Sequence, residues 1–420
     1  MVHRLHSKYG DFVRIAPNHV SIADPRALQD IYGHNTGFVK GPFYDAFHQT
    51  EPGLFGLRNL DMHQKRRKLI TPFFSPANLT AFEPQVSASV LKLRQSLSGI
   101  AASEQPTTNF SLYGFLDRGY DHSNLIESLD SRGLVVNALG YMPSWCRLLM
   151  MYNFFGYFWH RGLSGLCHLG VVGRTAYFSR KAGTVTRDRK DVLSFVIEPG
   201  NEKAAGAYSE VALVAESVGL IIGGSDTTSS TMTHFVDLVS RDPLLQKRLQ
   251  DKLDAAFPGV EGEGNWVADF ATADKLPILR ATLRETMRLR PTSATGLERV
   301  TPPGGRVVAD VSIPAGLTCV PSKDPTDFNI DRWLQPDAGQ LSEYFKPFSL
   351  RPRSCIGRNF AWMEAIKTLA ALFCLLNFSR ARNGPTELKE GFILKVKECM
   401  VRVSRRDIDR IVTFSDVESP

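Results

Sequence analysis

One helical pattern of apolar residues is interrupted by a polar octet. Apolar runs of helical length, Val211 to Ile222 and Met232 to Val239, flank the sequence Gly-Gly-Ser-Asp-Thr-Thr-Ser-Ser at residues 223–230. Glycine and serine runs usually mark linkers. Because both flanks are apolar, the pattern instead predicts one long buried helix. Each mid-helix glycine costs about 1 kcal/mol relative to alanine, which indicates a local kink or the close approach of a ligand.

Two further segments are predicted to be helical. Leu279 to Arg290 is amphipathic and stops at Pro291, since proline cannot continue a helix. Glu285 and Arg288 lie three residues apart on one face of this segment, where side chains can pair. Such pairs are common on solvated helix surfaces, so the pair alone does not indicate a function. The second segment is the apolar periodic run Phe360 to Leu376.

The best candidate for a metal ligand is Cys355, just before that second run. A helix beginning after Cys355 would aim its unpaired N–H groups and the positive end of its dipole at the sulfur, which favours a thiolate. A thiolate held in this way can ligate iron. Arg353 could reach an anionic group beside the metal, and Gly357 leaves room for a flat ligand. Free cysteines are nevertheless usually buried, inert core.

Composition narrows the class of protein. With 420 residues, 43% of them hydrophobic, the chain can bury a large core, and no linker divides it, so residues 1–420 are predicted to form one domain. Six cysteines without a C-x-x-C pair argue against a disulfide scaffold or a zinc site. The net charge of +7 favours an acidic electron-donor protein or anionic lipid as a partner. No nucleic-acid motif accompanies that charge, so no nucleic-acid partner is expected.

The residues around Cys355 resemble the cysteine loop of the cytochrome P-450 family of haem-thiolate monooxygenases, most closely the microsomal type of fungal metabolism. The family pattern Phe-x-x-Gly-x-Arg-x-Cys-x-Gly is matched at Phe348, Arg353, Cys355 and Gly357, with Ala361 at a small-residue position in the following helix. The resemblance implies a mainly α fold with small β-sheets, in which a helical bundle with a long central helix surrounds haem b. It also implies that Cys355 is the axial thiolate ligand of the haem iron.

Other segments fit the family in the same order along the chain. In the polar octet, the resemblance implies that Thr227 hydrogen-bonds the dioxygen substrate and that Asp226 relays protons toward it. Glu285, Arg288 and Arg332 would form a buried charge network that locks the core around the cysteine loop. Removing one partner from such a network is strongly destabilising, because the remaining charge is left uncompensated.

A basic segment, Asp61 to Lys68, precedes the apolar residues Leu69 to Phe74. By itself it is typical of a solvated helix face. In the family, the corresponding helix carries an aromatic residue or histidine followed four residues later by arginine, both near a haem propionate. His63 and Arg67 fit that spacing, so the resemblance implies that they bind the cofactor.

The chain also departs from the family. Arg351 stands where the family has glycine, and its bulky side chain could strain the loop or obstruct haem. The chain is shortened after Val320 and, by a whole helix, between Tyr113 and Gly114. It begins at Met1 without the transmembrane anchor of microsomal members. Two hypotheses follow: an active monooxygenase, or a catalytically impaired haem-binding or apo remnant of the same family.

For an active enzyme, the resemblance implies insertion of one oxygen atom into a lipophilic small molecule, in secondary metabolism. Electrons would come from NADPH-cytochrome P-450 reductase at the cytosolic face of the endoplasmic reticulum membrane. Peroxygenase, isomerase or dehydratase chemistry is a lesser alternative, since such variants often lack the acid and alcohol pair present here. Tyr141 to Trp159 is interpreted either as an interfacial loop that contacts lipid or as an ordinary buried helix.

The expected substrate walls are mostly aliphatic and aromatic, which favours an apolar ligand. They comprise four segments: Lys40 to Leu60, Trp145 to Phe158, Val214 to Gly224 and Thr292 to Leu297.

Overall fold

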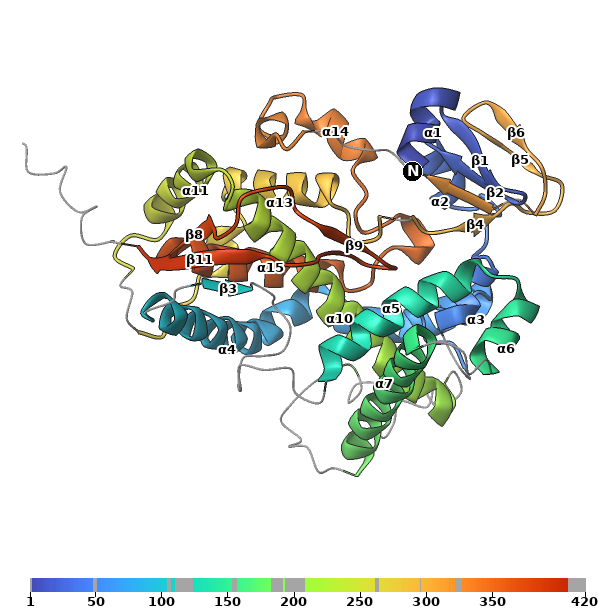
Figure 1. The fold of residues 1–420 in the computed structure, drawn as a ribbon, viewed down its shortest axis with the longest axis horizontal. Coiled ribbons are helices and arrows are strands. Elements are labelled where there is room, and N and C mark those ends of the chain that lie inside the picture. Colours follow the sequence, from blue (N-terminus) through green and yellow to red (C-terminus); the bar gives the residue numbers. More distant parts are fainter. Residues whose placement is uncertain are drawn as a thin grey trace, which may run out of the picture.

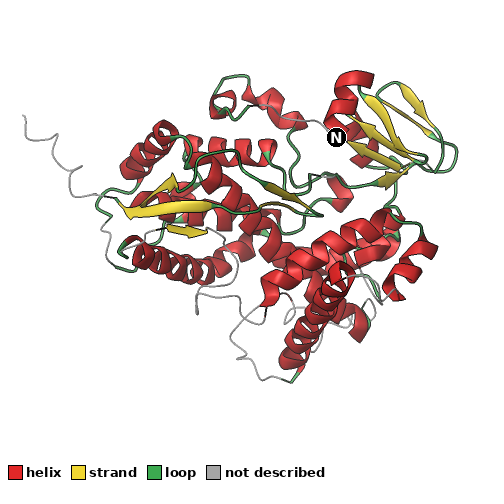
Figure 2. Cartoon of the chain, viewed as in Figure 1, coloured by secondary structure: helices red, strands yellow, loops and turns green. Residues whose placement is uncertain are grey.

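Helices make up most of the molecule, and the strands form small sheets, one beside the N-terminus and others among the helices (Figures 1 and 2). This arrangement confirms the prediction of a mainly α fold with small β-sheets. The computed structural model describes residues 2–47, 51–103, 107–109, 124–152, 157–182, 192, 208–260, 264–294, 296–316, 318–321 and 327–406.

The α-helices vary widely in length, and helix α10 is 30 residues long. Their bounds are Val2–Tyr9 (α1), Ala27–Tyr32 (α2), Leu60–Ile70 (α3), Pro76–Ala101 (α4), Leu125–Tyr141 (α5), Ser144–Tyr152 (α6), Tyr157–Lys181 (α7), Glu210–Val239 (α10), Pro243–Ala256 (α11), Phe270–Ala273 (α12), Pro277–Leu289 (α13), Ala338–Tyr344 (α14) and Arg358–Leu375 (α15). Short 3-10 helices cover Pro42–Phe47 (η1), Thr71–Phe74 (η2), Ile330–Trp333 (η4) and Arg351–Arg353 (η5).

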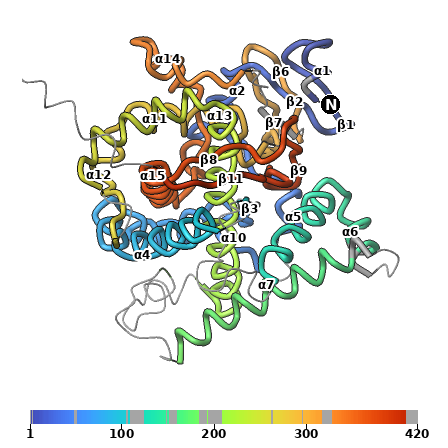
Figure 3. The backbone as a smooth tube through the Cα atoms, turned by 60° about the vertical axis from the view of Figure 1, so that its left-hand side comes forward, coloured from blue at the N-terminus to red at the C-terminus, as the bar shows by residue number. Residues whose placement is uncertain are grey.

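Helix α10 runs through the middle of the molecule, between the other helices (Figure 3). It begins at the cap residue Ser209, whose side chain accepts a hydrogen bond from the N–H of Ala212, and it continues without a break through the polar octet. The prediction of one long helix is therefore confirmed. By length and hydropathy, α10 is also the one helix in the described part of the chain that could cross a membrane. Only 28% of that apolar window is buried. The helix is buried throughout from Thr228 to Val239, whereas Val211, Val214, Leu220 and Ile222 line the large cavity described below, so the predicted burial holds for its C-terminal part.

The largest sheet has the strand order β1-β2-β7-β4 and lies beside the N-terminus (Figure 1). Strand β2 pairs in parallel with β7, and the other pairings in the described sheets are antiparallel. The remaining sheets have the orders β3-β11-β8, β5-β6 and β9-β10. The strands are Phe12–Ala16 (β1), His19–Ile22 (β2), Thr107–Asn109 (β3), Arg299–Val300 (β4), Arg306–Val308 (β5), Val311–Ile313 (β6), Thr318–Pro321 (β7), Leu376–Arg380 (β8), Leu388–Glu390 (β9), Leu394–Val396 (β10) and Met400–Arg405 (β11).

The main hydrophobic core is formed by α4, α10, α11, α13, α15 and the β8–β11 pair. Helix α15 is buried on all sides along most of its length, as expected for a helix that is apolar all round. Because α15 follows Cys355 directly, this packed core fixes the position of the cysteine loop. The shortening predicted between Tyr113 and Gly114, and most of the one after Val320, fall outside the described residues.

Candidate active site

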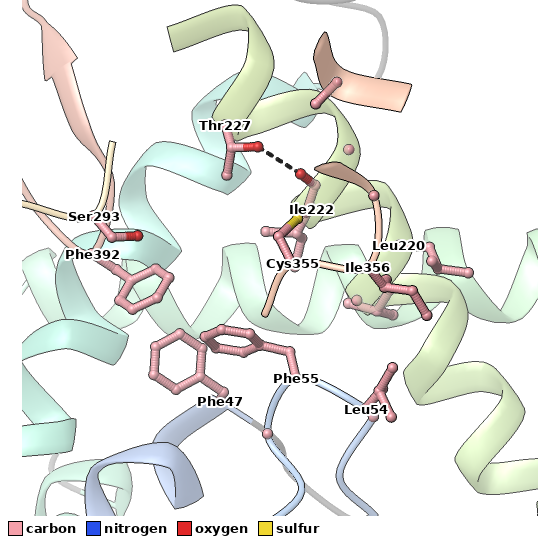
Figure 4. A pocket seen from close by; sticks show the side chains of 18 of the residues that line it. Phe47, Leu54, Phe55, Leu220, Ile222, Thr227, Ser293, Cys355, Ile356 and Phe392 are labelled. Atoms are coloured by element: carbon pink, nitrogen blue, oxygen red, sulfur yellow. Dashed lines mark hydrogen bonds between the residues drawn. The ribbon is translucent and has the colours of Figure 1, made fainter. Parts of the chain in front are cut away.

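A large cavity lies between α10 and the loop that carries Cys355, with a volume of about 960 Å³. Figure 4 shows side chains from both elements pointing into it. The volume is at the upper end of the range for small-molecule sites, and the walls are mainly apolar. Eight of the predicted site residues line this cavity: His63, Arg67, Thr227, Phe348, Arg353, Cys355, Gly357 and Ala361.

The loop before α15 places Cys355 at the cavity. The N–H of Cys355 donates to the carbonyl oxygen of Phe348 at 2.8 Å, which closes the loop into a tight turn. Burial raises the pKa of the Cys355 thiol, while the N–H of Gly357 and the charges of Arg67 and Arg358 lower it. The effect of the Gly357 N–H has the direction expected for a helix N-terminus, but burial outweighs it, so the pKa of the thiol lies above its usual value. A thiolate at this position therefore needs a further positive charge, such as a bound metal ion.

Arg351 occupies the loop position where the family has glycine, and its backbone has φ of +54°. A side chain costs roughly 1 to 2 kcal/mol in this left-handed region, so the first half of the prediction, a strained loop, is confirmed. The side chain itself is exposed and is absent from the cavity wall. Arg351 therefore does not obstruct the cavity.

Five basic side chains gather beside the cavity; we call them the basic cluster, and they are Lys40, His63, Arg67, Arg299 and Arg353. Arg353 donates to the carbonyl oxygens of Leu57 at 2.6 Å and Arg58 at 2.9 Å. Arg67 donates to the carbonyl oxygen of Ser354 at 2.7 Å. These bonds tie α3 and its preceding loop to the cysteine loop.

The basic cluster is buried in part, with Arg67 and Arg353 half-buried, and it has no carboxylate partners in the described part of the chain. Lys40, His63 and Arg299 are 5%, 3% and 3% exposed. Among the described residues, no carboxylate forms an ion pair with any member of the basic cluster. The Nδ1 atom of His63 has no hydrogen-bond partner.

Burial and like charges act together on these groups. Burial, with Arg353 and three other cations, lowers the pKa of His63 to about 3. Burial and Arg299 lower the pKa of Arg353 to about 10. Burial lowers the pKa of Lys40 well below its usual value, helped by the charges of Arg299 and Arg353. Without a ligand, burial and mutual repulsion thus favour the neutral forms of His63 and Lys40, and a bound anion would favour their charged forms.

Thr227 and Asp226 lie on different sides of helix α10. The hydroxyl of Thr227 faces the cavity and donates to the carbonyl oxygen of Gly223 at 2.8 Å (Figure 4). Asp226 is 4% exposed and lies in a small pocket behind the helix, where its Oδ1 is 2.5 Å from Nζ of Lys395. The structure thus brings Thr227 to the cavity but not Asp226.

Glu285, Arg288 and Arg332 meet away from the cavity, as predicted. The fully buried Glu285 carboxylate lies 2.8 Å from Arg288 and 3.1 Å from Arg332. It also accepts hydrogen bonds from the N–H of Asn329 and the indole N–H of Trp333, both at 2.8 Å. Burial raises the pKa of Glu285, but these donors outweigh burial and hold the pKa below its usual value. We call these five residues the Glu285 network.

The expected substrate walls are only partly those observed. Parts of the first, third and fourth predicted segments line the cavity. In the second segment, Trp145 and Leu149 are 67% and 63% exposed and lie outside the wall, so that expectation was wrong for the described residues. The neighbouring α7 takes this place, with Leu166, Gly170, Val171 and Phe178. Because α7 packs along both α5 and α10, only the tertiary fold could indicate its role.

Buried polar groups at the cavity were also missed. Glu216 of α10 accepts a hydrogen bond from the N–H of Leu54 at 2.7 Å and so fixes the loop before α3; burial raises the pKa of Glu216 to about 6. Arg132 of α5 lines the cavity, and so does Phe392 at the tip of the β9–β10 hairpin. The sequence gives one weak indication of these groups: Lys40, a charged residue, stands between Val39 and Gly41.

Among the described residues, no group of three or more His, Cys, Asp or Glu side chains could hold a metal ion.

Solved structures share this fold. The crystal structure described as the cytochrome P450DA heme domain matches with a TM-score of 0.76 and 15% sequence identity, covering 97% of this chain and 93% of that one. A variant of the same domain matches equally well. These likenesses define the class of fold.

Sequence comparisons then identify the family. The family model for cytochrome P-450 matches residues 174–403. Benzoate 4-monooxygenase bphA from Aspergillus niger is 30% identical, with 97% of this chain and 88% of that protein covered. Tryprostatin B 6-hydroxylase from Aspergillus fumigatus is also 30% identical, with 89% and 69% covered. The chain belongs to the cytochrome P-450 family, and it is a monooxygenase of the fungal type.

Proposed function

We propose that Cys355 binds the iron of a haem in this cavity and that the basic cluster binds the haem propionates. The single observation that carries this proposal is the basic cluster itself. Its basic groups are buried or half-buried, repel one another when charged, and have no carboxylate partners in the described chain. A dianionic cofactor would satisfy them, and the spare Nδ1 of His63 would gain an acceptor. The apolar walls and the cysteine suit the rest of a flat macrocycle.

When bound, a haem with an axial thiolate supplies the redox chemistry for activating dioxygen. The chain's own residues position the reactants and supply protons. The Thr227 hydroxyl lies on the cavity side of α10 and can donate a hydrogen bond there, in exchange for its bond to Gly223. Asp226 would deliver protons only after leaving Lys395, which makes that ion pair a control point for proton supply.

The substrate class follows from the cavity walls. Phe47, Phe55 and Phe392 lie together with ring centroids 4.7 to 5.6 Å apart, and Leu54, Leu220 and Ile222 extend the apolar surface (Figure 4). A lipophilic small molecule fits this surface. By its name, the relative from Aspergillus niger acts on benzoate, an aromatic compound, which supports an aromatic substrate, and the fungal relatives support a role in fungal secondary metabolism.

We also propose a flavoprotein partner, NADPH-cytochrome P-450 reductase, at the cytosolic face of the endoplasmic reticulum membrane. The net charge of +7 favours an acidic donor protein and anionic lipid. Trp145 and Leu149 lie four residues apart on α6, exposed to solvent. An exposed aromatic and aliphatic pair on one helix face is typical of interfacial membrane contact.

The competing hypothesis, an impaired remnant, rested partly on Arg351. The exposed position of that side chain, outside the cavity wall, favours the active enzyme.

The test is a carbon monoxide difference spectrum of the reduced, haem-supplemented protein, with the Cys355→Ser variant as its control. A strongly red-shifted Soret band in the wild type that disappears in the variant is the expected result. A band at the position of a histidine-ligated haem, or no uptake of haem, would favour the impaired remnant.

A further inference from the structure

In the part of the chain that the structure describes, a buried arginine at the cavity forms no ion pair with a carboxylate. Arg132 of α5 is 6% exposed and lies in the walls of both the large cavity and the small pocket behind α10. Within the described chain its hydrogen bonding is poor, because Nη2 is 3.4 Å from the carbonyl oxygen of Phe47 and the buried Nε has no partner. A buried guanidinium N–H without an acceptor costs free energy. The position therefore suits an added ligand with acceptor atoms.

The neighbouring charges leave Arg132 uncompensated. In the small pocket, Nζ of Lys395 lies 2.5 Å from both Asp130 and Asp226, and Nζ of Lys389 lies 2.9 Å from Asp130. The two carboxylates are thus already shared by two lysines, and Arg132 is a third cation. Burial lowers the pKa of Arg132 to about 10, and the charge of Asp226 opposes this only in part. One negative charge from a ligand would balance the group.

Arg132 is separate from the basic cluster at the cysteine loop. Arg132 lies beside Phe47 and in the wall of the small pocket behind α10, whereas Arg67 and Arg353 bind the carbonyl oxygens of Ser354, Leu57 and Arg58 at the cysteine loop and the loop before α3. A cofactor held by the basic cluster would consequently leave Arg132 unpaired. The anion that pairs with Arg132 would have to belong to another molecule in the cavity.

The surroundings of Arg132 indicate what that molecule is. Its guanidinium lies 5.7 Å from the ring centroid of Phe47, and Phe47 contacts Phe392 edge to face at 4.7 Å. Figure 4 shows these two rings and Phe55 pointing toward one another inside the cavity. Aromatic rings prefer such offset and edge-on contacts with a further ring. A planar carboxylate matches the fork of donors on a guanidinium.

We propose that Arg132 binds the carboxylate of an aromatic carboxylic acid substrate whose ring packs against Phe47 and Phe392. This assignment rests on the proposed function, because it names the substrate class of the same cavity. A phosphorylated ligand fits less well, since the cavity is mainly apolar and a phosphate carries more negative charge than the single unbalanced positive charge at Arg132.

The experiment compares matched ligand pairs on the haem-supplemented protein. Benzoate, phenylacetate and 2-naphthoate are each titrated against the corresponding neutral amide, by calorimetry and by the change in the Soret band. In the wild type, we expect at least one carboxylate to bind more tightly than its amide. In Arg132→Gln, that preference should fall by roughly 30-fold or more, as expected for the loss of one partner of a buried charge pair.

Two further variants make the result specific. Arg132→Lys keeps the charge without the fork of donors and should retain part of the preference. Arg161→Gln removes an exposed arginine on α7 that pairs with Glu127 outside the cavity, and it should leave the preference unchanged.

Two results would overturn the proposal: each amide binding the wild type at least as tightly as its carboxylate, or a preference that survives in Arg132→Gln. Calorimetry detects binding whether or not the carbon monoxide spectrum reports a thiolate-ligated haem. A failure of the proposed function and a failure of this inference are thereby distinguished.

Discussion

Two buried groups of charges in this protein are organised in opposite ways. In the Glu285 network, one carboxylate receives two guanidinium groups, a backbone N–H and an indole N–H, all within 3.1 Å. The basic cluster has five basic side chains and no ion pair to a carboxylate among the described residues. The Glu285 acid has its pKa lowered by its partners, whereas His63 and Lys40 have theirs lowered by burial and repulsion.

This difference indicates that the Glu285 network stabilises the fold, whereas the basic cluster binds a ligand. A group whose charges are satisfied internally can hold helices α13 and η4 together without any ligand. A group of like charges that is buried and unpaired opposes folding, and it is retained where a ligand of opposite charge stabilises it. The two groups should therefore respond differently to mutation, to pH and to haem.

The largest expected effect is at the Glu285 network. Glu285→Gln leaves Arg288 and Arg332 without their carboxylate, which should lower the free energy of unfolding by about 3 kcal/mol. The loss should be the same with and without haem, because the network lies outside the cavity. Denaturant unfolding of both forms measures it, with the exposed Glu343→Gln as the control. Equal stability of the two variants would show that the network is not structural.

The next effect is the pH dependence of the haem-free protein. His63 has a folded pKa of about 3 and an ordinary value of 6.5, so the unfolded state binds the extra proton between these values. The contribution of His63 to the free energy of unfolding is therefore fully present above pH 6.5. It is lost as the pH falls toward 3, by at most about 1.4 kcal/mol per pH unit. Between pH 7 and 5, the wild type should lose about 2 kcal/mol more than His63→Phe, as measured by denaturant unfolding.

Haem should flatten this pH dependence, since propionates next to His63 would favour its protonated form. Identical slopes for the wild type and His63→Phe would argue against an unpaired, buried His63. The pKa of Glu285 is lowered from 4.5, so its contribution is present above that value and is lost only as pH falls below it. The two groups therefore act in different pH ranges.

A smaller effect is expected for Lys40. Lys40→Met keeps the length of the side chain and removes a buried amine. Among the described residues, this amine donates only to the carbonyl oxygen of Phe55, and it lies over the rings of Tyr44 and Phe55. Haem should bind roughly tenfold more weakly, while the haem-free protein should be equally or more stable. Haem transfer to an acceptor protein and thermal unfolding measure the two quantities. The exposed Lys65→Met is the control, and weaker stability without a change in haem affinity would contradict the prediction.

The smallest effect is expected at Arg351. Arg351→Gly removes the cost of a side chain at φ of +54° and should stabilise the protein by about 1 kcal/mol. Arg351→Ala also deletes the guanidinium but keeps the unfavourable backbone, so it should give little of this gain. Thermal unfolding of the pair tests the argument. If alanine stabilises as much as glycine, the strain lies in the side chain and not in the backbone.

Sequence patterns were sufficient for the parts of the molecule that are local. The apolar run after Cys355 became α15, and the apolar flanks of the polar octet became one helix, α10. Residues at fixed spacing, such as His63 and Arg67 or Glu285 and Arg288, were identified because one helix sets both positions.

Contacts between distant segments could not be predicted in this way. Asp226 and Thr227 are neighbours in sequence, yet the fold turns one toward Lys395 and the other toward the cavity. Lys40 and Arg299 joined the basic cluster from loops and a short strand far from any motif. Trp145 was expected in the cavity wall, and α7 took its place.

The sequence by itself determined the helical class, the family and the cysteine that can hold iron, because periodicity and short motifs are set by residues close together along the chain. Only the tertiary structure decided which charges are compensated, because that depends on how far apart the folded elements bring them. In the folded chain, Glu285 is paired with two arginines, whereas His63 of the basic cluster and Arg132 each keep a buried nitrogen without a hydrogen-bond partner among the described residues. We propose an anionic ligand for each of these two sites.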